Sequence, residues 1–290
     1  MEFKTDSATP LLEALRKLYP DSSRRTLQNW LKSGRFSLNG KVLQKENTTL
    51  VAGDVLSSQE TFRRPRVPGV PILHEDRYII AIDKPEGLLS TPLDEEGSNK
   101  KHALGILREY YETDQIFAVH RIDRETSGVL LFARGKQSAE RLGEMFEAHD
   151  LQRRYSAIIE GNLKEDSGTW ECPLLELPNL NVVESIDGKL AITHFEVYRR
   201  SAKYTYINLT LETGKKHQIR AHCKRAGHPV VGDKRYGSKE DPLGRLCLHA
   251  RSIEFVHPFT KKMLYIESPL HKSFQVLGGH VIHDKSKKML

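Results

Sequence analysis

The residues with the clearest chemical potential lie in the segment 120–135, HRIDRETSGVLLFARG. One carboxylate, Asp123, lies between Arg121 and Arg124, and the apolar run at residues 129–133 predicts a buried strand soon after it. A carboxylate on a loop that such a strand holds could act as a nucleophile or as a general base. A lone Asp in a charged loop is usually structural, and Asp123 could cap the turn that follows or pair with an arginine at the surface. This segment alone leaves these interpretations open.

Two further segments carry candidate side chains. In RRYSAIIEG, Tyr155 precedes an apolar run, and the commonest place for such a tyrosine is the core or the edge of a strand. In ETGKKHQIRAH, Gly214 predicts a sharp turn into a helix whose start crowds cations together. Helix N-termini attract phosphate, although a solvated basic helix start has the same pattern. The polar residues there are Lys215, Lys216, His217, Gln218, Arg220 and His222.

These segments predict no metal centre. His217 and His222 do not have the spacing of the zinc motif HExxH, and the nearest cysteine and carboxylate in the sequence, Cys223 and Glu212, do not complete a metal-ligand pattern with them. The three cysteines, Cys172, Cys223 and Cys247, are far apart and also lack metal-ligand spacing. We therefore expect no metal, and the absence of a Rossmann or P-loop glycine pattern is consistent with no other cofactor.

The composition restricts the class of protein. The chain has 290 residues, of which 38% are hydrophobic and 29% charged, so a soluble globular protein with room for two domains is expected. A formal net charge of +7 favours a polyanionic partner. An apolar run of membrane length and a secretory pattern are both absent from the sequence. We expect a cytoplasmic protein without membrane association, and a monomer.

Periodicity predicts the elements that must position the candidate residues. We expect helices where apolar residues recur every three to four positions, and strands in runs rich in β-branched and aromatic residues. The expected helices of the longer, C-terminal part cover 101–111, 136–149 and 217–227, and the expected strands cover 79–82, 129–133, 153–161, 193–200 and 203–214.

Residues 1–62 read as a small separate module. Two helical segments, PLLEALRKLY and SSRRTLQNWLKSG, precede a hairpin signal at Asn39-Gly40 and a further strand with a turn at Gly53-Asp54. The stretch SRRTLQNWLKSGRFSLNGKVL resembles the S4 RNA-binding domain, and residues 22–45 hold six Lys or Arg and no Asp or Glu. Trp30 and Phe36 could be core residues or stacking platforms. The candidate RNA-binding residues here are Arg24, Arg25, Lys32, Arg35 and Lys41.

The prolines and arginines of RRPRVPGVP predict a linker over residues 63–71. A second domain is expected over residues 72–270. The polar tail, residues 271–290, is either partly disordered or an additional contact arm.

The three chemical segments, together with HPVVGDKRYG and LHARSIEFVHPFT, resemble the RluA-type family of RNA pseudouridine synthases over about residues 72–269. The first segment matches the family motif His-Arg-Leu-Asp, two variable residues, Thr-Ser-Gly, with Ile122 replacing Leu. The later one carries Lys215 where Arg is usual and Lys216 where Thr or Ser is usual. The resemblance implies an α+β fold with a mixed, mostly antiparallel sheet in two halves and an active site in the central cleft.

The resemblance also implies roles for individual residues. Asp123 would be the essential carboxylate and Arg220 its cationic partner. Tyr155 would stack on the target uracil, and Arg121 would help to hold the flipped nucleotide or its displaced neighbours. The cations and polar groups Lys215, Lys216, His217 and Gln218 would contact the RNA backbone.

The expected function is an isomerase that converts specific uridines of structured RNA into pseudouridine. Large-subunit ribosomal RNA is the favoured substrate and tRNA the second. A different class of function is a non-catalytic RNA-binding ribosome assembly factor, which would have no need of Asp123, Tyr155 and Arg220 together. A third is a hydrolase with an Asp123/His120 pair, although the sequence shows no Gly-x-Ser-x-Gly motif.

Overall fold

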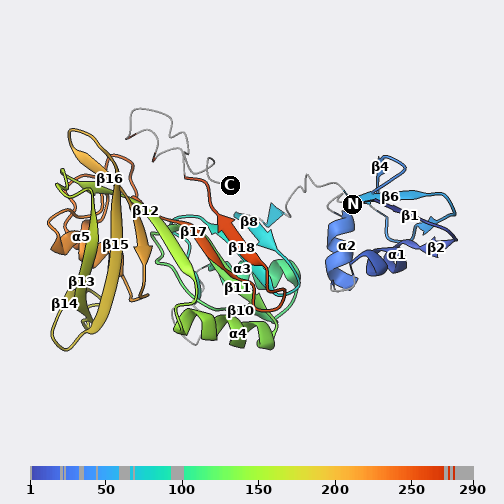
Figure 1. Cartoon of the computed structure of the whole chain (residues 1–290), viewed down its shortest axis with the longest axis horizontal. Coiled ribbons are helices and arrows are strands. Elements are labelled where there is room, and N and C mark those ends of the chain that lie inside the picture. The colour runs from blue at the N-terminus through green and yellow to red at the C-terminus, as the bar shows by residue number, and fades with distance from the viewer. Residues whose placement is uncertain are drawn as a thin grey trace.

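The structure is a computed structural model that describes residues 2–19, 22, 24–32, 36–43, 45–58, 66–67, 69–92, 101–270, 274 and 277. Figure 1 shows two parts, a small N-terminal module and a larger part built on one long sheet. Within the described residues, no helix is long and apolar enough to cross a membrane.

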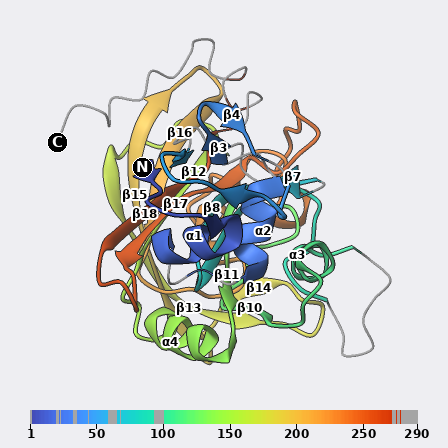
Figure 2. The same ribbon diagram turned by 90° about the vertical axis from the view of Figure 1, so that its right-hand side faces the viewer.

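The N-terminal module packs two helices against short strands (Figure 2). Its four-stranded sheet has the order β1-β6-β3-β4, and β2 pairs with β5. Trp30 and Phe36 are buried in its core, where Tyr19 contacts both rings, so neither is a stacking platform for RNA. The elements are β1 (Glu2–Lys4), β2 (Thr9–Pro10), α1 (Leu11–Leu18), α2 (Arg24–Lys32), β3 (Phe36–Leu38), β4 (Lys41–Val42), β5 (Thr49–Leu50) and β6 (Val55–Ser58).

The larger part is a twelve-stranded sheet with helices packed against it. Its order is β14-β13-β15-β16-β12-β17-β11-β9-β8-β7, with β10 paired to β11 and β18 paired to β17. The strands are β7 (Arg66–Val67), β8 (Val70–Glu75), β9 (Ile79–Lys84), β10 (Ile116–Ala118), β11 (Ser127–Arg134), β12 (Gln152–Glu160), β13 (Ser167–Glu176), β14 (Val182–Glu184), β15 (Lys189–Arg200), β16 (Tyr204–Leu211), β17 (Leu248–Val256) and β18 (Met263–Glu267). The helices are α3 (Ala103–Tyr111), α4 (Lys136–Glu147), α5 (Gln218–Arg225) and the 3₁₀ turn η1 (Lys234–Tyr236).

The two halves of the sheet meet at one short parallel contact, between β11 and β17. All other named strand pairs in the described residues are antiparallel, so the sheet is mixed but mostly antiparallel, as predicted. At this junction Gly128 lies against the backbone of Ala250 with a φ of +111°, and a Cβ on Gly128 would collide with the Ala250 carbonyl. The glycine of the motif's Thr-Ser-Gly therefore allows the two halves of the sheet to approach closely at this contact.

The positions of the predicted elements agree with the structure, with two differences. Residues 66–71 belong to the predicted linker, but β7 and the start of β8 form a hairpin there at the edge of the sheet, with Val67 and Val70 buried. Pro71 precedes Ile72, the first residue of β8 that pairs with β9, so it removes no N–H from the ladder between these two strands. The helix predicted from residue 217 begins as α5, but the left-handed turn before it lies at His217 (φ 50°), not at Gly214. Gly34, Arg35 and most of the predicted tail lie outside the described residues.

Candidate active site

The loop that carries Asp123 is fixed by hydrogen bonds to the turn after β9. Lys84 is fully buried, and its ammonium donates to the carbonyls of Pro85, Leu88 and Arg124 at 2.7–3.1 Å. Burial lowers the pKa of Lys84 to about 8. The hydroxyl of Ser90 also donates to the Ile122 carbonyl at 2.7 Å. These contacts hold the loop in place on both sides of Asp123.

His120 closes the other end of this loop. Its Nε2 accepts a hydrogen bond from the Leu131 N–H at 2.9 Å, and its ring stacks on Phe146 with centroids 4.5 Å apart. Burial, together with the positive charge of Arg153, lowers the pKa of His120 to about 3. A neutral histidine that accepts from backbone is a structural residue, and no ion pair joins it to Asp123 within the described part of the chain.

Asp123 and Arg220 come together across the junction, although they are 97 positions apart. The Arg220 Nη1 lies 3.3 Å from Asp123 Oδ2 and 3.7 Å from Glu125 Oε2. Its Nε and Nη2 donate to the two carboxylate oxygens of the buried Asp233, at 2.7 and 2.8 Å. Burial would lower the pKa of Arg220, but the three carboxylates raise it overall. The guanidinium is therefore permanently charged and turns one edge toward Asp123.

His217 is the second group that faces Asp123. Its Nε2 lies 3.8 Å from Asp123 Oδ2, and its Nδ1 lies 2.9 Å from the Tyr236 hydroxyl, which accepts from the Val182 N–H. Burial lowers the pKa of His217, while the negative charge of Asp123 acts in the opposite direction. A neutral His217 with its proton on Nε2 directs that proton toward the carboxylate, because the Tyr236 hydroxyl can donate to Nδ1.

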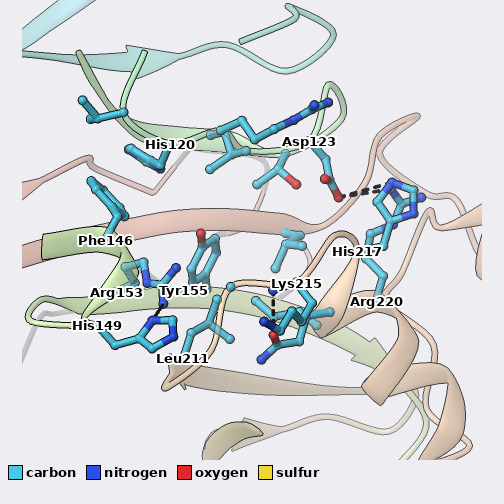
Figure 3. A pocket seen from close by; sticks show the side chains of 18 of the residues that line it. His120, Asp123, Phe146, His149, Arg153, Tyr155, Leu211, Lys215, His217 and Arg220 are labelled. Carbon is cyan, nitrogen blue, oxygen red and sulfur yellow. Dashed lines mark hydrogen bonds and ion pairs between the residues drawn. The ribbon is translucent and has the colours of Figure 1, made fainter. Parts of the chain in front are cut away.

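Tyr155 lies in the same pocket, on β12. β12 pairs regularly with β16 here, whereas its pairing with β17 has a bulge whose extra residue, Arg251, lies on β17. Figure 3 shows the Tyr155 ring between Asp123 and Arg220 on one side and Arg153 and His149 on the other. Burial raises the pKa of Tyr155 to about 12, so its phenol is neutral at neutral pH. The pocket has a volume of about 350 Å³ and combines these polar groups with apolar side chains such as Leu211 and Leu248.

The other predicted site residues of the larger part have different surroundings. Arg121 and Lys215 line the pocket. Lys216 pairs with Glu176. Gln218 also lines the pocket, but it is buried and its amide is hydrogen-bonded within the protein, so its contact with RNA remains a prediction. Its oxygen accepts from the Lys215 N–H and the Thr213 hydroxyl, and its nitrogen donates to Ile192 and Thr193.

The basic residues of the N-terminal module lie apart from this pocket. Arg24 is exposed and pairs with Glu46 at 3.3 Å, and Lys41 is exposed on β4. The side chains of Arg25 and Lys32, and the whole of Arg35, lie outside the described part of the structure. The RNA contacts of this module remain a prediction.

Three residues of the site were not among the predicted ones. Asp233 and Tyr236 hold Arg220 and His217, and Lys84 holds the Asp123 loop. The signal for the first two was present in the segment HPVVGDKRYG, and for the third in the turn at Lys84-Pro85. In the described ranges, no three His, Cys, Asp or Glu side chains are grouped as metal ligands.

Comparison with known proteins identifies the family. A family model for RNA pseudouridylate synthase matches residues 78–225, about half of the chain, and an S4 domain model matches residues 9–56. The chain belongs to the RNA pseudouridylate synthase family. It is an isomerase that acts on RNA, and its N-terminal module carries an S4 domain.

Relatives of this pseudouridine synthase extend over most of the chain. It is 33% identical to an uncharacterized RNA pseudouridine synthase, YhcT, of Bacillus subtilis, with 86% of this chain and 85% of the relative covered. It is 30% identical to ribosomal large subunit pseudouridine synthase D of Xanthomonas campestris, with 94% and 89% covered. The fold matches that of human RNA pseudouridylate synthase domain containing 1, with a TM-score of 0.59 and 23% identity over 70% of this chain and 84% of that one.

Proposed function

We propose that this enzyme converts specific uridines of large-subunit ribosomal RNA into pseudouridine, with Asp123 as the reacting carboxylate. The observation that carries the chemistry is the convergence of Asp123, Arg220 and Tyr155 on one pocket. The substrate class is supported by relatives named ribosomal large subunit pseudouridine synthase D, at about 30% identity over most of the chain. We propose a cytoplasmic monomer, and the three free, buried cysteines suit a reducing compartment.

The reaction rearranges one nucleotide without importing atoms. The N1–C1′ bond of uridine breaks, the uracil turns, C5 forms the new bond to C1′, and the C5 proton is replaced by one on N1. The Asp123 carboxylate acts either as a nucleophile at C1′ or as a base at C2′. In both cases it must be ionised.

Arg220 supports this ionised state. Its guanidinium lies 3.3 Å from the Asp123 carboxylate and attracts its negative charge directly. Because Asp233 holds Arg220 at two nitrogens, the guanidinium cannot easily swing away when substrate enters. Preorganised charge of this kind does not need to reorganise during the reaction.

Tyr155 offsets the cost of removing the target base from its stack. Base extrusion costs a few kcal/mol, and stacking on an aromatic ring contributes about 1–3 kcal/mol per base. The neutral Tyr155 ring faces the pocket beside Leu211. A uracil on this ring has its sugar toward Asp123 in the arrangement that the chemistry requires.

The test uses RNA from cells that lack the gene. Pseudouridines are mapped by carbodiimide adducts and reverse-transcriptase stops, in cells carrying wild type, Asp123→Asn or Glu147→Gln. Glu147 is a matched control because it is a carboxylate that lines the same pocket and has no ion pair with Arg220. We expect specific stops in large-subunit ribosomal RNA to vanish, and to return with wild type and Glu147→Gln only.

Two results would contradict the proposal. If stops vanish from tRNA alone, the proposed chemistry is retained but the substrate is tRNA instead of ribosomal RNA. Pseudouridines that all persist, with Asp123→Asn restoring growth as well as wild type, would favour the non-catalytic assembly factor.

A further inference from the structure

Arg153 is a cation of the pocket that the reaction described above does not use. It lies two residues before Tyr155 on β12, so both side chains project from the same face of the strand. Its Nη2 donates to His149 Nδ1 at 3.4 Å, on the side of α4. On the other side, a Cβ on Gly214 would lie 2.5 Å from its Nη1. The guanidinium thus lies between His149, just after α4, and the turn that leads into α5. Figure 3 shows Arg153 beside His149.

No carboxylate of the described residues balances the charge of Arg153. Its Nε is buried without a hydrogen-bond partner, and no carboxylate of the described residues lies within 4.0 Å of it. Burial lowers its pKa, and its charge in turn helps to lower the pKa of His120. Arg220 in the same pocket differs, because three carboxylates surround its guanidinium. A half-buried guanidinium without a counter-charge is costly unless an anion joins it.

We propose that Arg153 binds a backbone phosphate of the substrate RNA, next to the target nucleotide, and so positions the uracil on Tyr155. This inference rests on the proposed function and names a further contact of the same site. The substrate supplies anionic oxygens only through its phosphates, and a guanidinium binds phosphate through paired hydrogen bonds. Gly214 leaves room for the guanidinium, because any side chain at that position would displace it.

The neighbouring residue Arg154 offers a matched control. It lies on the same strand, carries the same charge, is exposed, and contacts Gln152 and Glu254 instead of the pocket. Arg153→Gln and Arg154→Gln therefore change the net charge equally. Only the first removes the contact that we infer.

The experiment measures binding and single-turnover isomerisation of a synthetic RNA stem-loop that carries a mapped target uridine, at several salt concentrations. We expect Arg153→Gln to weaken binding about tenfold and to flatten the log–log salt dependence by about 0.7–0.9, the change expected for one phosphate contact. Arg153→Lys should restore most of the slope, and Arg154→Gln should behave as wild type. At saturating RNA, Arg153→Gln should still form pseudouridine.

A second measurement identifies the phosphate. Each linkage around the target uridine is replaced in turn by a neutral methylphosphonate. One replacement should weaken RNA binding by the wild-type enzyme about tenfold. The same replacement should not weaken RNA binding by the Arg153→Gln variant any further. This test needs only wild-type protein for its first half, so it stands even if the variant does not fold.

The proposal is overturned if no methylphosphonate weakens wild-type binding. It is also overturned if the loss of binding free energy from Arg153→Gln and the loss from the replaced linkage are additive. An unchanged salt slope with a slower chemical step would also overturn it and would place Arg153 at the uracil instead. Failure of the proposed function gives a different result, namely RNA binding without pseudouridine from the wild-type enzyme.

Discussion

Asp233 determines which edge of Arg220 reaches Asp123. Its carboxylate is fully buried and binds Arg220 at Nε and Nη2, so the guanidinium presents Nη1 to Asp123 and Glu125. The Arg220 guanidinium also lies over the Tyr236 ring, 5.0 Å from its centroid. A lysine at position 220 would supply charge but not this fork of donors.

The pH dependence of stability is a prediction at the residue scale. The pKa of His120 is about 3 in the folded protein, below the value of about 6.5 expected when unfolded. As the pH falls below 6.5 the unfolded chain takes up this proton before the folded protein does. The stabilisation that comes from keeping His120 neutral is therefore fully present above about pH 6.5. As the pH falls toward 3, the free energy of unfolding decreases by up to about 1.4 kcal/mol per pH unit.

His120→Gln tests this dependence. A glutamine oxygen can still accept from the Leu131 N–H but does not titrate. Urea unfolding at a series of pH values should show wild type losing stability faster than the variant as the pH falls below 6.5. Parallel curves for the two proteins over that range would contradict the prediction.

At the scale of elements, the parallel contact between β11 and β17 joins the two halves of the sheet. The Asp123 loop runs into β11, while β17 pairs on its other side with β12, which carries Tyr155. The side chains at the contact are also linked, since Ser127 Oγ lies 2.9 Å from His249 Nδ1 and accepts from Arg245 at 2.8 Å. The relative position of Asp123 and Tyr155 therefore depends on this contact.

Gly128→Ala is the corresponding prediction. It introduces both an unfavourable φ and a collision with the Ala250 carbonyl. Gly135→Ala is the control, because Gly135 also has a positive φ (83°) but has open space where a Cβ would lie. Left-handed backbone costs about 1–2 kcal/mol for a residue with a Cβ. We expect Gly128→Ala to lower the free energy of unfolding by about 2 kcal/mol more than Gly135→Ala, as measured by urea unfolding. Equal losses would show that the close approach of the strands is unimportant.

At the scale of the whole molecule, the chain combines a small basic module with a larger catalytic part. The module has its own buried core, formed by residues of α1, α2, β3 and neighbouring strands. We propose domain limits of 1–62 and 72–270, with the sheet itself beginning at β7. Phosphate contacts of such a module position RNA and specify little sequence.

Removal of the module is the prediction at this scale. A chain that begins at residue 66 should fold and form pseudouridine at saturating RNA, but bind RNA more weakly and with a flatter salt dependence. Arg24→Gln/Lys41→Gln in the full-length chain removes two exposed cations and should flatten the log–log slope by roughly 1.5. Filter binding of ribosomal RNA fragments measures both. A truncated chain with unchanged affinity and slope would assign RNA binding to the catalytic part alone.

The sequence by itself determined the three α-helices and five of the twelve strands of the larger part, and it indicated the chemistry. Helix and strand positions follow from periodicity, which is a local property, and the hairpin at Asn39-Gly40 follows from backbone preferences of those two residues. The motif around Asp123, with Tyr155 and Arg220 in the later segments, was sufficient to indicate the family. The local pattern also explains why the turn before α5 was misplaced, since His217 adopts a left-handed conformation that glycine usually occupies.

Only the tertiary structure decided how these residues meet. It placed Arg220 between Asp123 and Asp233, buried Gln218 within the protein, and surrounded Lys84 with carbonyls of the Asp123 loop. Such pairings depend on the order of strands in the sheet and on the parallel contact at Gly128, which no short segment encodes. The physical reason is that charge and hydrogen bonding at a site are set by distances across the sheet, whereas sequence patterns report distances along the chain.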